Sequence, residues 1–233
     1  MIVVSRAIMS TDFIFMLTHH DVTVPNALEL FERVKGTGLR CVGCKDIGLE
    51  INALRRLFSE MKNARMKTFL EVVTMKEEEH FEGVNKAIEI GSQYLIGGMP
   101  QYTEKTIRYL KERKSETKFF PYIGKIVGHP CLLRGTIQEI VADAKRTRKL
   151  GADGINLLAY RYDGDVIQLI EAVQAATDLP LVIAGNVDSY ERINEMKRLG
   201  VWAYTIGGAI MEKRFLPGKD EAEQIKAVLR ATN

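Results

Sequence analysis

Glu71 is the residue whose surroundings point most directly to chemistry. It lies within the run Phe69-Leu70-Glu71-Val72-Val73, where all of its neighbours are apolar. A carboxylate in a strand that is covered on both faces must be paired or functional, because an isolated buried charge is costly. Glu71 is therefore a candidate general base, and a tie between neighbouring strands is the structural alternative.

Two lysines end apolar runs and could act on a carbonyl group. Lys45 comes after Cys44 and before Asp46, and Lys125 follows a tyrosine and a glycine. A lysine in such a position can polarise a carbonyl oxygen, clamp a phosphate, or form a Schiff base if its pKa falls from about 10.4. We expect Lys45, Asp46 and Lys125 to belong to a catalytic site, with solvated surface lysines as the alternative.

Histidine, the side chain that titrates near neutral pH, follows the first apolar run. His19 and His20 are adjacent, and adjacent side chains on an extended segment point in opposite directions, so one of the two faces a common site. We take His19 as the catalytic candidate and His129, in a later loop, as a second one. A histidine in a loop can equally be structural or solvated.

Glycines end two apolar runs in the last quarter of the chain, 179–186 and 202–209. A residue without Cβ lets the main chain approach an anion closely, and successive N–H groups can then point at that anion. This pattern predicts a phosphate site. Its residues are Gly185, Asn186, Gly207 and Gly208.

A similar segment, which also ends in a glycine pair, occurs about half a chain earlier. Residues 94–98 and 204–208 agree at four of five positions. A duplicated half-barrel would place these segments in strands 4 and 8, and it predicts a second ligand site at Gly97 and Gly98. The alternative is that Ile-Gly-Gly is only a frequent way to end a buried strand.

A polar pair near the middle of the chain completes the candidate substrate site. Asn156 and Tyr160 share one face if the two-residue period of a strand runs through both. An amide in a covered strand needs hydrogen-bond partners. We therefore expect Asn156 and Tyr160 to face the lumen that the strands enclose and to bind substrate.

The elements that must position these residues are short apolar runs that alternate with amphipathic stretches. The predicted strands are 13–18, 39–44, 67–72, 93–96, 118–124, 154–158, 181–184 and 202–206. The predicted helices are 24–36, 50–64, 77–91, 103–114, 135–150, 164–176, 188–199 and 219–231. Helix starts carry the capping residues Thr103, Thr136, and Asp188 or Ser189.

Strict alternation of strands and helices predicts a parallel sheet that is covered on both faces. Eight such units predict an α/β protein, a (β/α)8 TIM barrel, and the lack of a dividing linker predicts a single domain over residues 1–233. An open doubly wound sheet would more often carry a Gly-x-Gly-x-x-Gly turn after its first strand, and the first predicted strand here is followed by no glycine. In a barrel, chemistry occurs at the carboxyl ends of the strands, and the loops after strands 7 and 8 hold phosphate.

The composition is typical of a globular protein, with 46% hydrophobic and 27% charged residues. The 33 basic and 30 acidic residues leave a net charge of +3 and form no basic arm, so we expect no nucleic-acid partner. No apolar run suits a membrane span, the first residues lack the order of a secretory signal, and three cysteines form no disulfide framework; we expect a cytoplasmic protein. The mixed carboxylate and lysine ends need no metal, and we expect no cofactor.

The segment 199–210, Leu-Gly-Val-Trp-Ala-Tyr-Thr-Ile-Gly-Gly-Ala-Ile, with residues 211–215 after it, resembles the end of the N-acetylmannosamine-6-phosphate 2-epimerases. More broadly, it resembles the ribulose-phosphate-binding barrel superfamily, which includes the histidine-biosynthesis isomerases. The resemblance implies a phosphate held at the four glycine-loop residues, with the short helical turn beyond them. In the epimerases a glutamate precedes the glycine of strand 7, where this chain has Ala184.

Two functions of different classes follow. One is an isomerase, epimerase or aldolase for a phosphorylated, sugar-like molecule, in which Glu71 moves a proton beside a carbonyl that Lys45 or Lys125 polarises. The other is a sensor barrel that binds a phosphometabolite and reports it to a partner without catalysis. Both imply a phosphorylated small-molecule ligand, and association into a homo-oligomer stays open.

Overall fold

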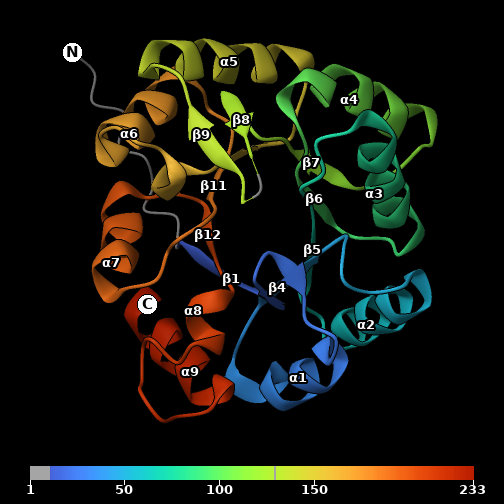
Figure 1. Cartoon of the computed structure of the whole chain (residues 1–233), viewed down its shortest axis with the longest axis vertical. Helices are drawn as coiled ribbons and strands as arrows, with labels where there is room; N and C mark the ends of the chain where they lie inside the picture. The colour runs from blue at the N-terminus through green and yellow to red at the C-terminus, as the bar shows by residue number, and fades with distance from the viewer. Residues whose placement is uncertain (1–10, 129) are drawn as a thin grey trace.

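The computed structural model describes residues 11–128 and 130–233. Eight parallel strands form a barrel and follow one another around it in chain order (Figure 1). The strands are β1 (Asp12–Met16), β4 (Cys41–Lys45), β5 (Lys67–Val72), β6 (Tyr94–Gly97), β7 (Lys118–Phe120), β10 (Ile155–Leu157), β11 (Leu181–Ile183) and β12 (Ala203–Ile206). β12 pairs with β1, so the last strand lies against the first.

The remaining junction, between β7 and β10, is made by backbone bonds outside a regular ladder. The Asp153 N–H donates to the Phe119 carbonyl at 3.0 Å, and the Asn156 N–H donates to the Pro121 carbonyl at 2.9 Å. An isolated bridge joins Tyr122 to Asn156. The chain is therefore a single-domain (β/α)8 TIM barrel, as the alternation of its elements predicts.

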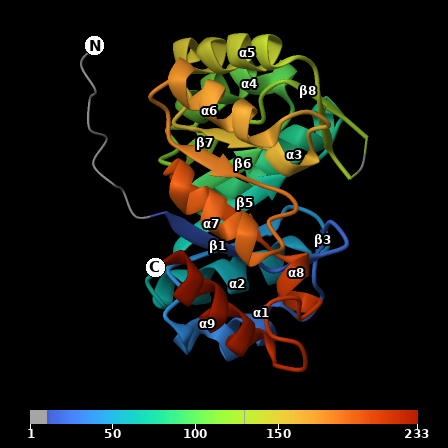
Figure 2. The same cartoon turned by 90° about the vertical axis from the view of Figure 1, so that its left-hand side faces the viewer.

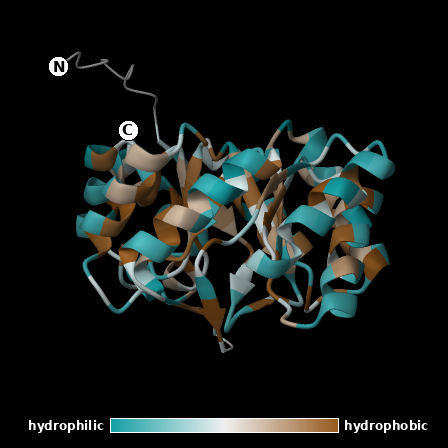
Figure 3. Ribbon diagram, turned by 90° about the horizontal axis from the view of Figure 1, so that it is seen from above, coloured by the Kyte–Doolittle hydropathy of each residue, from teal (hydrophilic) through white to brown (hydrophobic). Residues whose placement is uncertain are grey.

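Helices surround the strands, and each buries one face against them. In α2, Leu54, Leu57, Phe58 and Met61 recur at helical spacing and are fully buried. Figure 2 shows α6 and α7 outside the strands, and in Figure 3 hydrophilic residues gather on the helices and loops. Among the described residues, no helix combines the length and the apolar character that a membrane span requires. The helices are α1 (Ala27–Val34), α2 (Ile51–Asn63), α3 (Glu77–Glu89), α4 (Thr103–Glu112), α5 (Ile137–Leu150), α6 (Val166–Ala176), α7 (Tyr190–Leu199), α8 (Gly208–Met211) and α9 (Glu221–Thr232).

Two short hairpins, which the periodicity does not predict, stand at the carboxyl ends of the strands. They are β2 (Thr18–His19) with β3 (Val22–Thr23), and β8 (Lys125–Val127) with β9 (Leu132–Arg134). The predicted strands 13–18 and 118–124 end early, because the chain leaves the sheet for a hairpin after Met16 and after Phe120. The eight predicted strands and eight predicted helices otherwise overlap the observed ones.

The lumen of the barrel is filled at its amino-terminal end. The rings of Trp202 and Phe120 lie 5.2 Å apart there, and Asp12 pairs with Arg40 at 2.6 Å and with Lys67 at 2.8 Å. These contacts fill the lumen at the amino-terminal ends of the strands, and the carboxyl ends are where TIM barrels bind their ligands. The apolar residues of the lumen are Ile14, Met16, Cys41, Phe69, Ile96, Phe120, Val182 and Ala203.

Candidate active site

A cavity of about 330 Å³ opens at the carboxyl ends of the barrel strands. It is lined by the ends of β1, β4, β5 and β12, by the loops that follow β7, β10 and β11, and by residues of both hairpins. Functional sites of TIM barrels lie at this end. The sequence-predicted residues that line the cavity are His19, Lys45, Glu71, Gly185, Asn186, Gly207 and Gly208.

Lys45 and Glu71 lie side by side at the ends of β4 and β5. They are partners in the parallel register of the two strands, and they are 6% and 7% exposed. The Lys45 Nζ atom lies 3.9 Å from Glu71 Oε2. The candidate base and one of the two candidate lysines therefore point into the same cavity.

Tyr122 holds the other oxygen of Glu71. Its hydroxyl donates to Glu71 Oε1 at 2.7 Å, and the side chain is buried. Burial, together with the negative charge of Glu71, raises the pKa of Tyr122 well above its ordinary value, so the phenol keeps its proton and remains a donor. One oxygen of the carboxylate is thereby fixed while the other faces Lys45.

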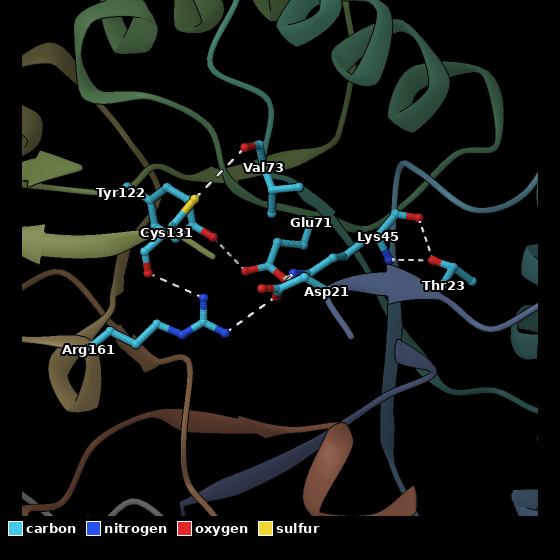
Figure 4. A network of polar contacts seen from close by, with 8 residues as sticks. All are labelled: Asp21, Thr23, Lys45, Glu71, Val73, Tyr122, Cys131 and Arg161. Carbon is cyan, nitrogen blue, oxygen red and sulfur yellow. Dashed lines mark hydrogen bonds and ion pairs between the residues drawn. The ribbon is translucent and has the colours of Figure 1, made fainter. Parts of the chain in front are cut away.

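Asp21 and Arg161 extend this arrangement on the other side of Lys45. The Lys45 ammonium donates to Asp21 Oδ1, and Arg161 Nη2 lies 3.4 Å from the same oxygen. Burial opposes the charge on Asp21, but Lys45 and Arg161 outweigh it and hold the pKa of this carboxyl below its usual range. Figure 4 shows the resulting row, in which cations and carboxylates alternate from Arg161 to Glu71.

Cys131, between β8 and β9, lies against this row. Arg161 Nη1 donates to the Cys131 carbonyl at 3.3 Å, and the thiol lies 3.9 Å from the Val73 carbonyl. Burial and the charge of Glu71 raise the pKa of the Cys131 thiol, so it stays protonated. Two further cysteines are buried free thiols. They are Cys41 and Cys44, and burial raises the pKa of each to about 12.

The loops after β11 and β12, which we call the glycine loops, form another wall of the cavity. In the part of the chain that the structure describes, the N–H groups of Gly185, Asn186, Gly207 and Gly208 donate to no backbone carbonyl. α8 begins directly at the last of these residues. Unused N–H groups beside a helix start are the kind of donors that an anion accepts.

Two of the glycines in these loops also make room for protein side chains. A Cβ at Gly185 would lie 2.7 Å from Arg161 Nε, and a Cβ at Gly207 would lie 2.6 Å from Thr18 Oγ1. Arg161 therefore reaches the row of charges by passing over Gly185. The packing of Arg161 on Gly185 links the glycine loops to the end of the cavity that holds Lys45.

Charged side chains surround the glycine loops. Arg214 pairs with Asp188 at 2.8 Å and with Glu212 at 2.7 Å, and His19 Nε2 lies 3.5 Å from Glu212. Glu212 thus shares its charge between two basic groups. An anion at the glycine loops would compete with Glu212 for Arg214 and His19.

Two of the predicted catalytic residues lie outside the cavity. Lys125 is exposed on β8, because the chain has already left the barrel for the hairpin at this point. Asp46 is buried and turned toward α3, where a Cβ at Gly83 would lie 2.6 Å from its Oδ2. Burial raises the pKa of Asp46 to about 6. Neither Lys125 nor Asp46 lines the cavity that Lys45 and Glu71 share.

The predicted pair Asn156 and Tyr160 does not share a face. Asn156 is fully buried on β10, and both polar atoms of its amide lack a hydrogen-bond partner among the described residues. Tyr160 lies in the 3₁₀ turn η3 (Ala159–Arg161), which breaks the two-residue period of the strand. Its hydroxyl bonds to Glu195, and Arg192 lies over its ring at 4.6 Å. Neither Asn156 nor Tyr160 lines the cavity.

Gly97 and Gly98 also lie outside the lining of the cavity. Their φ values are +81° and +80°, and a Cβ at Gly97 would lie 2.5 Å from the Val72 carbonyl oxygen. A Cβ at Gly98 would lie 2.6 Å from His80 Cε1. Close packing of backbone and side chains therefore accounts for this glycine pair without a ligand.

The sequence did not identify four of the residues that meet at the site. They are Asp21, Tyr122, Cys131 and Arg161. Asp21 was visible as the third residue of His19-His20-Asp21, but Tyr122 and Arg161 stand in segments whose conformation is set by hairpins and turns. No local spacing connects residues that are 140 positions apart, as Asp21 and Arg161 are. The candidate His129 lies outside the described residues.

The arrangement can move a proton and stabilise a negatively charged oxygen. Glu71 presents a carboxylate to the cavity, and the neighbouring Lys45 ammonium can donate to an oxyanion. Within residues 11–128 and 130–233, no group of three or more His, Cys, Asp or Glu side chains is placed to hold a metal ion.

Comparison with known proteins shows where this chain has relatives. No family model matches it. It is 29% identical over 99 residues to a protein of Enterobacter sp. (strain 638) named as an N-acetylmannosamine-6-phosphate 2-epimerase. That match covers 38% of this chain and 42% of the relative, so the chain spans less than half the length of the curated protein it matches.

Solved structures share the fold. The N-acetylmannosamine-6-phosphate 2-epimerase from Clostridium perfringens superposes with a TM-score of 0.63 at 12% identity, over 88% of this chain and 91% of that chain. The YdjI aldolase from Escherichia coli K12 superposes with a TM-score of 0.63 at 12% identity, over 96% of this chain and 89% of that chain. The chain is thus similar in fold to epimerase and aldolase barrels, and the resemblance of its sequence to the epimerases is confirmed.

Proposed function

We propose that this barrel is an enzyme that transfers a proton at a carbon next to a carbonyl group in a phosphorylated, sugar-like small molecule. The observation that carries the proposal is the pairing of Lys45 and Glu71, 3.9 Å apart, in a cavity that the glycine loops also line. A base beside a cation is the minimum needed to form an enolate. Isomerases, epimerases and aldolases share that intermediate.

Glu71, Tyr122 and Lys45 each have a role in this reaction. Glu71 Oε2 takes the proton from the carbon, while the Tyr122 hydroxyl holds Oε1 in place. The electron pair of the broken C–H bond moves to the carbonyl oxygen, which the Lys45 ammonium stabilises as it becomes negative. We assign Lys45 this electrostatic role, because both of its charged neighbours are carboxylates. If the proton returns to a different carbon atom, the reaction is an isomerisation. If it returns to the opposite face of the same carbon atom, the reaction is an epimerisation.

The glycine loops are proposed to hold the phosphate. Support comes from the unused N–H groups of Gly185, Asn186, Gly207 and Gly208 and from the start of α8 beside them. The curated relative is named for a phosphorylated sugar. A phosphate at the loops would leave the rest of the substrate within the same cavity as Lys45 and Glu71.

One position differs between this chain and the epimerases that it resembles. The position before the strand-7 glycine is Ala184, which is buried and carries no ionisable group. A base on β5 would therefore replace the strand-7 glutamate of the epimerases. This difference supports a reaction related to theirs rather than the same substrate.

The test is hydrogen exchange in deuterated water, followed by NMR, with a panel of phosphorylated aldoses, ketoses and N-acetylmannosamine 6-phosphate. We expect one of them to exchange a proton next to its carbonyl. Glu71→Gln and Lys45→Met should each slow this exchange by roughly 10²- to 10⁴-fold, the usual contribution of a positioned acid or base. Lys125→Met, which changes the other candidate lysine, should leave the rate within about threefold.

The same measurements contain the outcomes that oppose the proposal. Saturable binding of a phosphosugar without exchange or turnover would favour the sensor barrel instead. Exchange that survives Glu71→Gln would remove Glu71 from the role of base. Loss of exchange in Lys125→Met would move the chemistry to the β8–β9 hairpin.

A further inference from the structure

Asp21 stands in a turn whose backbone is unusual for its residues. The β2–β3 hairpin pairs Thr18 with Thr23 and His19 with Val22, so His20 and Asp21 form its two-residue loop. Their φ values are +48° and +63°. Two successive positive φ values are the mark of a type I′ turn.

This turn type favours glycine, asparagine and aspartate, and a left-handed conformation costs any residue with a Cβ free energy relative to glycine. A His-Asp sequence therefore adopts the turn at some cost to stability. Conformations of this kind persist where the surrounding structure enforces them, and they cluster at functional sites. Both residues of the turn line the cavity, and the Asp21 carboxylate is the group that contacts Lys45.

The hairpin is fastened to the strand that carries Lys45. The buried Thr23 hydroxyl donates to the Lys45 carbonyl at 2.8 Å and accepts from the Lys45 N–H at 2.9 Å. The Thr23 N–H donates to the Ile47 carbonyl at 3.1 Å. The turn and the backbone of Lys45 therefore form one rigid unit, in which the Asp21 carboxylate and the Lys45 ammonium are held together.

The other side of Asp21 is held by Arg161, 3.4 Å from the same carboxylate oxygen. Asp21 is thus confined between a guanidinium and an ammonium, and Lys45 is confined between Asp21 and Glu71. Movement of the Asp21 carboxylate would release the ammonium from its place beside Glu71.

We propose that Asp21 is a positioning residue that acts through Lys45. The hairpin turn holds the Asp21 carboxylate against the Lys45 ammonium, and this contact keeps the ammonium aimed into the cavity beside Glu71. Its effect on catalysis rests on the function proposed above. Its effect on the position and accessibility of Lys45 does not, and the two can be measured separately.

A matched control exists at the opposite end of the barrel. Asp12 is buried, and like Asp21 it pairs with one arginine and one lysine, here Arg40 and Lys67. It lies in the packed amino-terminal end, away from the cavity. Asp12→Asn removes an ion-paired carboxylate of the same kind and reports what such a loss does to stability alone.

The experiment compares Asp21→Asn, Asp21→Gly and Asp12→Asn with the unaltered protein. Asparagine and glycine both adopt positive φ readily, so each keeps the turn while it removes the charge. The first readout is the rate at which acetic anhydride acetylates Lys45, measured by peptide mass spectrometry with the exposed Lys118 as internal reference. The second is kcat and KM for any substrate found above, and the third is the thermal unfolding midpoint.

We expect acetylation of Lys45 to be several-fold faster in both Asp21 variants, because its side chain is no longer tied to the hairpin and its nitrogen can move to meet the reagent. We expect kcat to fall by roughly 10- to 100-fold with little change in KM, as displacement of a catalytic group by about 1 Å can do. Asp12→Asn should lower the unfolding midpoint and leave both other readouts unchanged.

An unchanged acetylation rate of Lys45 in the Asp21 variants would overturn the proposal, whatever happens to stability. The same holds if Asp12→Asn accelerates acetylation equally, since the effect would then report general loosening. If no substrate is found for the unaltered protein, the proposed function fails, but the acetylation result still decides the role of Asp21.

Discussion

Gly208 differs from the other glycines of the predicted phosphate site in having free space around it. A Cβ there would meet only Glu212 Oε1 at 3.6 Å and His19 Cδ2 at 3.8 Å, which are ordinary contacts. Its neighbour Gly207 has no such freedom, because a Cβ would press on Thr18. A side chain introduced at Gly208 therefore tests the chemistry of the loop, whereas one at Gly207 tests its packing.

We predict that Gly208→Asp binds inorganic phosphate at least about tenfold more weakly than Gly208→Asn. Two like charges about 4 Å apart repel by about 1 to 4 kcal/mol, and 1.4 kcal/mol is tenfold in affinity. The two introduced side chains have the same shape, so their difference isolates the charge. Titration calorimetry at constant ionic strength measures it. Equal affinities would place the phosphate elsewhere.

At the scale of elements, the starts of α4 and α5 show that a threonine predicted to cap a helix does so in one helix and not in the other. Thr136 caps α5 as predicted, in a capping box with Glu139. Thr103 was predicted to cap α4, but the chain enters that helix through the 3₁₀ turn η2 (Pro100–Tyr102), which places Tyr102 at the cap. The Thr103 hydroxyl is buried, and no residue in 11–128 or 130–233 forms a hydrogen bond with it. Both residues are threonines, and the 3₁₀ turn before α4 is the reason that Thr103 does not cap its helix.

We predict that Thr136→Ala lowers the free energy of unfolding by about 1 kcal/mol, the usual contribution of a side-chain cap. Thr103→Val removes a hydroxyl that bonds to nothing and keeps the volume, so it should leave the free energy of unfolding unchanged or raise it. Urea titration followed by circular dichroism measures both. A loss of similar size in the two variants would show that Thr103 also acts as a cap.

At the scale of the whole molecule, the junction between β7 and β10 closes the barrel and so creates the lumen. Gly154, just before β10, packs directly on the ring of Phe120 in β7, where a Cβ would lie 2.0 Å from Cε1. Phe120 in turn packs on Trp202 in the filled end of the lumen. Glycine at 154 therefore allows the last gap in the sheet to close over an aromatic core.

We predict that Gly154→Ala lowers the free energy of unfolding by about 1 to 3 kcal/mol, because the added methyl group forces a buried ring out of its place. Phe120→Leu should reduce the cost of the added methyl group, so the double variant should be more stable than the sum of the two changes predicts. Urea unfolding of the four proteins in this cycle measures the coupling. Strict additivity would mean that the two residues do not press on each other.

The sequence by itself determined the order and type of the eight barrel strands and of the helices around them, but not the two hairpins. Strand and helix periods, helix caps and glycine ends are local features, and eight repeats of one local pattern leave few folds open. The same local reasoning found Glu71, because a carboxylate in an apolar strand is anomalous wherever that strand lies. It also found Lys45, but it could not separate Lys45 from Lys125, since each follows an apolar run.

Only the tertiary structure decided which polar residues meet. β4 runs in the barrel as far as Lys45, whereas the chain leaves the barrel after Phe120, so Lys125 is carried outward on a hairpin. Asp21 and Arg161 come from loops 140 residues apart and meet only when β12 closes on β1 and β10 on β7. The energy of such contacts depends on distances across the barrel, and these are properties of the closed sheet that no short segment of the sequence contains.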